Sequence, residues 1–339
     1  MRVKGDSVHR DISKAHGAVP FTAVSNPTRR EFLTGGIAAT LAAALVQSSS
    51  RSLCGADEQD YWVDAHSHIW TPDVKNYPLV GGKGPEVLQP PSFTADELLQ
   101  TAQPFGVRRV VLIQHHIYHG FDNSYLIDET AFRPDTFRVV GMIDELHTHH
   151  PDVRMRQLLE KHVTGFRITP WIRPHGWLDS PGMQAMWRAA AETRQSMCCL
   201  IDPHNLEEVD RQCARFPHTP VVIDHFARIG VDGQIRDEDV ARLCRLARHP
   251  LVRVKISAFY ALGKKQPPYD DLLPMIRRVY EAFGPKRLLW GSDSPYQVVP
   301  PHSYAASVEL IRRIDFWTAE ERQWITRKTA EEVFFFDKS

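Results

Sequence analysis

Two histidines separated by a single residue stand in the segment Asp64-Ala65-His66-Ser67-His68. Side chains alternate between the two faces of an extended strand, so Asp64, His66 and His68 are predicted to share one face. Imidazoles at positions i and i+2 on one face can converge on a single metal ion. The pair alone is weak evidence, because two solvated histidines give the same pattern.

A second candidate follows an apolar run, in the segment Gly291-Ser292-Asp293-Ser294-Pro295. The carboxylate of Asp293 could bind a metal ion and accept a proton from an attacking water molecule. The alternative interpretation is that Asp293 forms a turn or caps a helix before Pro295.

Two more apolar runs end close to a histidine. His225 follows Val221–Asp224, and His204 follows Asp202 and Pro203. Four segments that each end in His or Asp indicate a shared functional site more strongly than any one of them does. A histidine after Asp-Pro can also begin the next helix, so the sequence leaves the role of His204 undecided.

The elements that must position these residues alternate regularly along the chain. Eight β-then-α units predict an α/β fold, a (β/α)8 TIM barrel, in which all strands present their carboxyl ends at one mouth. The predicted strands are Trp62–Ile69, Arg108–Gln114, Arg138–Ile143, Val163–Thr169, Met197–Asp202, Val221–Asp224, Val252–Ser257 and Arg287–Gly291, and the predicted helices include 94–105, 183–195, 205–216, 237–248 and 269–283.

A long Pro- and Gly-rich connection, residues 70–91, separates the first predicted strand from its helix. Connections of this length in compact domains are usually functional or disordered. Because it leaves the carboxyl end of a barrel strand, we expect it to overhang the barrel mouth.

The composition is that of a soluble globular protein, with 339 residues, 42% hydrophobic and 24% charged. Lys+Arg 41 balance Asp+Glu 41 and the pI is about 7.3, so no nucleic-acid partner is predicted. The five cysteines lack metal-ligand spacing. Adjacent Cys198 and Cys199 are predicted as small buried residues on opposite faces of a strand.

The first 54 residues form a basic leader with seven Lys/Arg and three Asp/Glu. Within it, the segment Thr28-Arg29-Arg30-Glu31-Phe32-Leu33 has the pattern of a twin-arginine signal. The apolar run that follows, residues 35–46, is too short to span a bilayer of about 30 Å. We therefore predict residues 1–54 as a twin-arginine signal peptide and linker, and residues 58–339 as one barrel domain. The predicted partner is the twin-arginine export machinery and the predicted location is the periplasm or another exported compartment, with no stable membrane span after cleavage.

Five segments, DAHSHIW, GFRITP, VVIDHFAR, VRVKISAFY and FGPKRLLWGSDSPY, follow one another in the order seen in a known family. On these segments the chain resembles the amidohydrolase superfamily, and within it the amidohydrolase 2 branch. The segment IQHHIYHGFDNSYLIDETAFRPDTFRVVGMID, together with IDHFAR, most resembles the 2-pyrone-4,6-dicarboxylate lactonases and related sugar lactonases.

The resemblance implies a role for each matching residue. His66 and His68 match the first-strand histidine pair of the family. His225 matches the sixth-strand histidine and Asp293 the eighth-strand aspartate. Decarboxylases of the same branch use a fifth-strand histidine as a metal ligand, a place that His204 could fill, whereas the pyrone lactonases lack this ligand and do not depend on a metal.

The number of metal ions is also implied by the resemblance. Two-metal members of the superfamily carry a carboxylated lysine on the fourth strand, and the corresponding segment Gly165–Thr169 contains no lysine. A site for one metal is therefore expected. Lys255 lies on the seventh predicted strand and is assigned a structural role.

Three arginines indicate the charge of the substrate. Arg167 and Arg173 leave the fourth predicted strand, and Arg228 follows His225. A guanidinium presents a planar fork that matches a carboxylate, so an acidic small molecule such as a carboxylated lactone is predicted. Ion pairing with nearby acids is the alternative interpretation, and it is about as well supported for Arg173.

Metal-assisted hydrolysis of a lactone is the function predicted from these residues. Asp293 would take a proton from the attacking water, and His225 would stabilise the oxyanion or relay a proton. One divalent ion, expected to be Zn²⁺, would be held by His66, His68, His204 and Asp293. Three alternatives stay open: a decarboxylase on the same barrel, a metal-free lactonase, and a barrel that binds acidic ligands without turnover.

Overall fold

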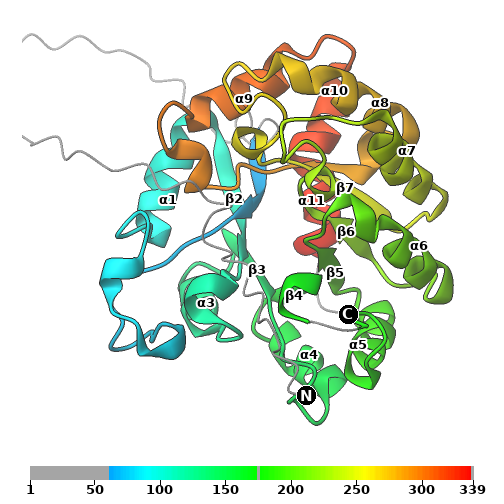
Figure 1. The fold of residues 1–339 in the computed structure, drawn as a ribbon. Helices are drawn as coiled ribbons and strands as arrows, with labels where there is room; N and C mark the ends of the chain where they lie inside the picture. Colours follow the sequence, from blue (N-terminus) through cyan, green and yellow to red (C-terminus); the bar gives the residue numbers. More distant parts are fainter. Residues whose placement is uncertain (1–60, 174–175, 337–339) are drawn as a thin grey trace, which may run out of the picture. The chain divides into compact units, whose positions relative to one another are not determined.

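The computed structural model describes residues 61–173 and 176–336, which form a barrel of eight parallel strands. The strands pair in chain order from β1 to β8, and helices lie around them (Figure 1). All eight overlap predicted strands, so the predicted barrel is confirmed. They are β1 (Trp62–Ser67), β2 (Val107–Ile113), β3 (Phe137–Gly141), β4 (Val163–Ile168), β5 (Ser196–Cys199), β6 (Val221–Ile223), β7 (Val252–Ile256) and β8 (Leu288–Trp290).

The barrel closes between the first strand and the loop after the last one. Ser67 and Ser294 form a parallel bridge, and the backbone N–H of His68 donates to the carbonyl of Ser294 at 2.8 Å. The backbone N–H of Asp293 donates to the carbonyl of His66 at 2.7 Å. Two motifs that lie far apart in the sequence are therefore hydrogen-bonded neighbours.

The helices follow the strands in the alternation expected for this fold. The first begins with a capping box: the Thr94 hydroxyl accepts a hydrogen bond from the N–H of Glu97, whose carboxylate accepts one from the N–H of Thr94. The helices are α1 (Ala95–Ala102), α2 (His116–His119), α3 (Ser124–Phe132), α4 (Pro151–Leu159), α5 (Pro181–Thr193), α6 (Leu206–Arg215), α7 (Asp237–Arg245), α8 (Leu273–Phe283), α9 (Tyr304–Arg313), α10 (Ala319–Gln323) and α11 (Thr329–Phe334).

The core has two parts, because each strand has an inner and an outer face. Cys198 belongs to a small cluster with residues of six strands, and such residues meet only inside the barrel. Phe334 of α11 is fully buried in the same cluster, so this helix closes the lumen. Burying a side chain of that size stabilises the fold by about 2–3 kcal/mol. Cys199 belongs instead to the larger cluster between strands and helices, as predicted for adjacent residues of a strand.

Several strands end earlier than predicted, which places polar residues in the loops at the barrel mouth. Strand β6 ends at Ile223 and β8 at Trp290. His225 and Arg228 have positive φ angles of 52° and 57°, and Asp293 has a φ of 62°. Residues other than glycine rarely adopt this conformation, and it is concentrated at functional sites.

The connection after β1 begins beside the barrel mouth. Trp70 pairs with Phe93 across its base, and the Trp70 ring lies 5.2 Å from the ring of His115 at the end of β2. The predicted signal peptide, residues 1–54, lies outside the described residues. In the part of the chain that the structure describes, every helix is too short or too polar to cross a membrane.

Candidate active site

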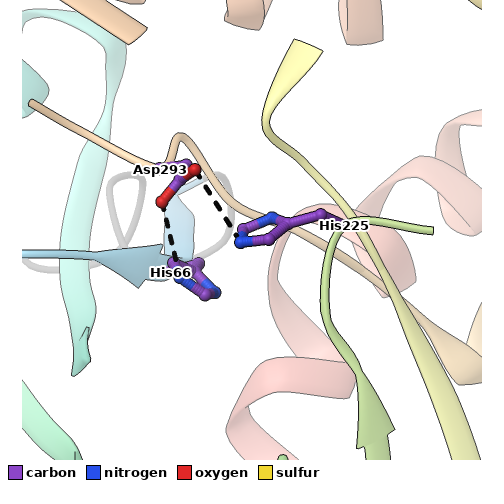
Figure 2. Close-up of side chains that lie close together, drawn as sticks. All are labelled: His66, His225 and Asp293. Carbon is purple, nitrogen blue, oxygen red and sulfur yellow. Dashed lines mark ion pairs between the residues drawn. The ribbon is translucent and has the colours of Figure 1, made fainter. Parts of the chain in front are cut away.

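Three side chains that lie far apart in the sequence meet at the barrel mouth (Figure 2). His66, His225 and Asp293 are buried, and one ligand atom from each lies within 4.8 Å of the others. Asp293 Oδ1 is 3.5 Å from Nε2 of His66, and Oδ2 is 3.7 Å from Nε2 of His225. His68 joins them, with its Nε2 3.3 Å from Asp293 Oδ1. We call these four residues the mouth cluster.

A break in the strand pattern aims His66 into the barrel. The sequence predicts that Asp64 and His66 share a face, and the structure shows that this is wrong. Asp64 accepts a hydrogen bond from Tyr304 of α9 on the outer side, whereas His66 contacts Arg167 of β4 across the lumen. The pairing of β1 with β2 shifts register between Asp64 and Ser67. Such an irregularity re-aims the side chains that follow it.

Asp64 holds the loop after β8 in place instead of facing the substrate. Its Oδ1 accepts the backbone N–H of Ser292 at 2.8 Å, and its Oδ2 accepts the Ser292 hydroxyl at 2.5 Å. Gly291 permits this close approach, because a Cβ at that position would lie 2.8 Å from the Cβ of His66. Asp64 thereby positions Asp293, two residues beyond Gly291.

His66 lies among buried charges, of which the sequence-based site included Arg167 but not Lys255 or Asp224. Arg167 Nη2 is 2.7 Å from its Nε2, and Lys255 Nζ is 3.1 Å from its Nδ1. Asp224 balances these cations, with Oδ1 3.1 Å from Lys255 Nζ and Oδ2 3.4 Å from Arg167 Nη2. The prediction of a purely structural Lys255 overlooked this contact with His66. A charged residue inside an otherwise apolar, buried strand was the available signal.

The other two imidazoles are oriented through their second ring nitrogen. Nδ1 of His68 lies 2.8 Å from the carbonyl oxygen of Ile113, and Nδ1 of His225 lies 2.8 Å from the hydroxyl of Ser257. A carbonyl can only accept, so Nδ1 of a neutral His68 carries the proton and Nε2 presents its lone pair to Asp293. Such outer contacts also orient metal-binding histidines.

Burial and neighbouring charges set the ionisation of the cluster. Burial lowers the pKa of His225 to about 4, and burial together with Lys255 holds the pKa of His66 well below its usual range. Burial also lowers the pKa of His68. Burial by itself raises the pKa of Asp293, but its interactions with His225 and His68 outweigh it and hold that pKa well below its usual range. At neutral pH, three neutral imidazoles therefore surround one carboxylate.

Tyrosines cover the open side of Asp293. The Tyr260 hydroxyl donates a hydrogen bond to Asp293 Oδ2 at 2.8 Å, and the Tyr260 ring stacks on Tyr296 at 6.0 Å between centroids. The Tyr296 hydroxyl lies 2.6 Å from Nε2 of His115. Sequence reasoning missed Tyr260, because it lies several residues beyond the end of β7 and its role depends on the loop.

His204 lies away from the mouth cluster and is exposed. Asp202 and Asn205 form a capping box at the end of β5, so the chain turns at Pro203 into a short 3-10 helix that carries His204 towards solvent. The structure therefore brings together His66, His68, His225 and Asp293, and leaves out the fifth-strand histidine.

The three predicted substrate-binding arginines have different surroundings. Arg167 lies against His66 inside the barrel. Arg173 forms a buried bidentate ion pair with Glu145, with N–O distances of 2.7 and 2.8 Å. Arg228 pairs with Asp202 at 2.8 Å, and its side chain remains 20% exposed. Of the three, Arg228 is the one best placed to meet a substrate from solution.

Comparison with known proteins matches most of this chain to one family. A family model described as Amidohydrolase matches residues 63–336. The chain is 26% identical over 246 residues to L-fucono-1,5-lactonase of Burkholderia ambifaria, covering 71% of this chain and 82% of that one. It is 27% identical over 246 residues to 4-sulfomuconolactone hydrolase of Rhizobium radiobacter (69% and 75%). It is 26% identical over 250 residues to 2-pyrone-4,6-dicarboxylate hydrolase of Comamonas testosteroni (71% and 78%).

A solved structure supports the fold. An amidohydrolase from Burkholderia multivorans, solved with bound zinc, superposes with a TM-score of 0.66 at 21% identity. The match covers 82% of this chain and all of that chain.

Proposed function

Since this chain belongs to the amidohydrolase family, we propose that it hydrolyses the ring ester of a lactone. The relatives described above are a lactonase and two hydrolases of cyclic esters. The observation that carries the proposal is the mouth cluster, in which one buried carboxylate lies among three imidazoles. This arrangement supplies a proton acceptor and polar groups that can face a carbonyl undergoing attack.

Asp293 is the proposed proton acceptor for the attacking water. Its carboxylate is held by the Tyr260 hydroxyl on Oδ2 and by the backbone that Asp64 clamps. Its pKa lies well below the usual range, so it is a weak base for ordinary water. Efficient transfer therefore calls for a positive charge near the water that makes it more acidic.

The donor set fits a divalent cation. The lone pair of His68 Nε2 faces Asp293 Oδ1 at 3.3 Å, and Nε2 of His225 lies 3.7 Å from Oδ2. At these distances, the lone pairs on the neutral imidazole nitrogens face the lone pairs on the carboxylate oxygens. Neither a proton nor a cation is shared between them. His66, His68 and Asp293 would hold one ion, and imidazole with carboxylate is a donor set suited to Zn²⁺. The ion would supply the Lewis acidity that activates water.

The remaining residues support the later part of the reaction. His225, oriented by Ser257, is the proposed group that stabilises the oxyanion or returns the proton to the departing ring oxygen. Arg228 is the proposed anchor for a substrate carboxylate, because it is partly exposed and rests on the Trp171 ring at 4.4 Å. The substrate class is therefore a lactone with an acidic substituent.

A panel of three lactones tests the activity: L-fucono-1,5-lactone, 4-sulfomuconolactone and 2-pyrone-4,6-dicarboxylate. We expect ring opening of at least one of them, followed as acid release, and a loss of kcat of about 10²- to 10⁴-fold in Asp293→Asn. Asp144→Asn, a change at a half-buried loop residue that pairs with the exposed His147, is the matched control. A near-wild-type rate in Asp293→Asn, or release of CO₂ from a carboxylated substrate without ring opening, would refute the proposal.

We also propose that residues 1–54 direct export through the twin-arginine pathway and that the barrel domain acts in the periplasm. The support is the Arg29-Arg30 pair in its Thr-Arg-Arg-Glu-Phe-Leu context. Changing both arginines to lysine should retain the unprocessed chain in the cytoplasm, as measured by cell fractionation. Unchanged export of that variant would contradict the assignment.

A further inference from the structure

The contact between Arg167 and His66 assigns the proton on the His66 ring. A guanidinium has only N–H donors, so at 2.7 Å Arg167 Nη2 must donate and Nε2 of His66 must accept. A neutral His66 then carries its proton on Nδ1, which lies 3.5 Å from Asp224 Oδ1. Lys255 Nζ lies 3.1 Å from Nδ1 and 3.1 Å from that same oxygen. A neutral ring accepts at one nitrogen only, so with the shorter contact taken by Arg167, Lys255 donates to Asp224 and not to the ring.

The same nitrogen faces the candidate metal site. Nε2 is the ring atom of His66 that lies 3.5 Å from Asp293 Oδ1, whereas Nδ1 lies beside Lys255 and Asp224. Nε2 has a single lone pair in the plane of the ring. That lone pair can receive the hydrogen bond of Arg167 or bind a metal ion, but it cannot do both.

Arg167 has room to change partner. Its side chain is buried, yet its Nε has no hydrogen-bond partner among the described residues. Asp224 Oδ2 lies 3.4 Å from Nη2 and offers the guanidinium a second acceptor. Releasing His66 would therefore leave Arg167 next to a carboxylate.

From these contacts we propose that Arg167 and a divalent cation compete for Nε2 of His66. Without a metal ion, the Arg167 guanidinium occupies the lone pair of His66 Nε2. Its hydrogen bond must break before the ion binds, and it thereby lowers the metal affinity of the site. The inference rests on the metal site of the proposed function, but not on the identity of the substrate.

The test measures metal affinity directly. Full-length wild type, Arg167→Met and Arg228→Met are stripped of metal and titrated with Zn²⁺ against a chromophoric chelator. A hydrogen bond to a charged group contributes on the order of tenfold to hundredfold in a binding constant, so Arg167→Met should bind Zn²⁺ at least about tenfold more tightly. Arg228→Met is the matched control, because it removes a guanidinium of the same mouth that pairs with Asp202 and not with His66. Unchanged or weaker binding in folded Arg167→Met would overturn the proposal.

A second measurement uses the wild type alone, in case Arg167→Met does not fold. Nitrogen NMR of metal-free protein with labelled histidine, assigned by comparison with His66→Gln, reports which ring nitrogen of His66 is protonated. We expect the proton on Nδ1 before Zn²⁺ is added. A proton on Nε2 would overturn the proposal, since Arg167 could not then donate to it.

Lactone turnover measured on the same preparations separates the two proposals. Tighter Zn²⁺ binding in Arg167→Met, without turnover of any lactone by the wild type, supports the competition and counts against the proposed function. Turnover by the wild type, together with unaltered Zn²⁺ affinity in Arg167→Met, supports the proposed function and counts against the competition.

Discussion

The buried ion pair between Arg173 and Glu145 separates a structural role for Arg173 from the substrate-binding role that its sequence position suggests. The guanidinium is 4% exposed and the Glu145 side chain 2% exposed. Two hydrogen bonds of 2.7 and 2.8 Å join them, and the carbonyl oxygens of Ile143 and Thr169 accept two more at 3.3 Å. Arg173 thus ties the loop after β3 to the loop after β4.

Replacing Arg173 with Met leaves the charge of Glu145 buried without a partner. Breaking a buried ion pair in this way costs about 3–5 kcal/mol, which corresponds to a fall in Tm of about 10 °C for a domain of this size. The double variant Arg173→Met with Glu145→Met removes both charges. It should recover at least about 2 kcal/mol relative to the single variant, because no unpaired charge remains.

Urea unfolding of wild type, both single variants and the double variant gives the coupling energy between the two residues. Below the unfolding transition, we expect kcat/KM for a lactone to stay within about threefold of wild type, since neither residue touches the mouth cluster. If Arg173→Met loses less than about 1 kcal/mol of unfolding free energy and its KM rises about 100-fold, this reasoning is refuted. Arg173 would then be a substrate-binding residue.

Three further predictions follow from other contacts. Burial raises the pKa of Asp64 to about 6 from an ordinary value of 3.8, so the folded state holds an extra proton between these values and stability falls as pH rises through them. Asp64→Asn should therefore gain about 2 kcal/mol relative to wild type between pH 4 and pH 7, as measured by urea unfolding, and a constant difference would contradict the assignment. Tyr260→Phe should lower kcat by about tenfold with little change in KM, because it removes one hydrogen bond to the Asp293 carboxylate; an equal rate would show that Tyr260 does not position it. His204→Ala should leave the zinc content unchanged in elemental analysis, whereas His66→Ala should abolish it. Zinc loss in His204→Ala would show that His204 is a metal ligand.

The order and type of the elements could be predicted from the sequence by itself, because they depend on local patterns. Apolar β-branched runs followed by helical stretches identify eight strands, and a polar residue after such a run marks the barrel mouth. His66, His68, His225 and Asp293 could be assigned to one site for this reason, since all parallel strands of a barrel end at the same face.

Only the tertiary structure decided which way these side chains point and what they meet. The register shift in β1 separates Asp64 from His66, and it depends on pairing with β2 and not on the local sequence. The partners of Arg167, Arg173 and Lys255 lie on other elements, so no spacing along the chain reveals them. Charges buried at such positions require partners in space, and the folded barrel supplies them across its lumen and between its loops.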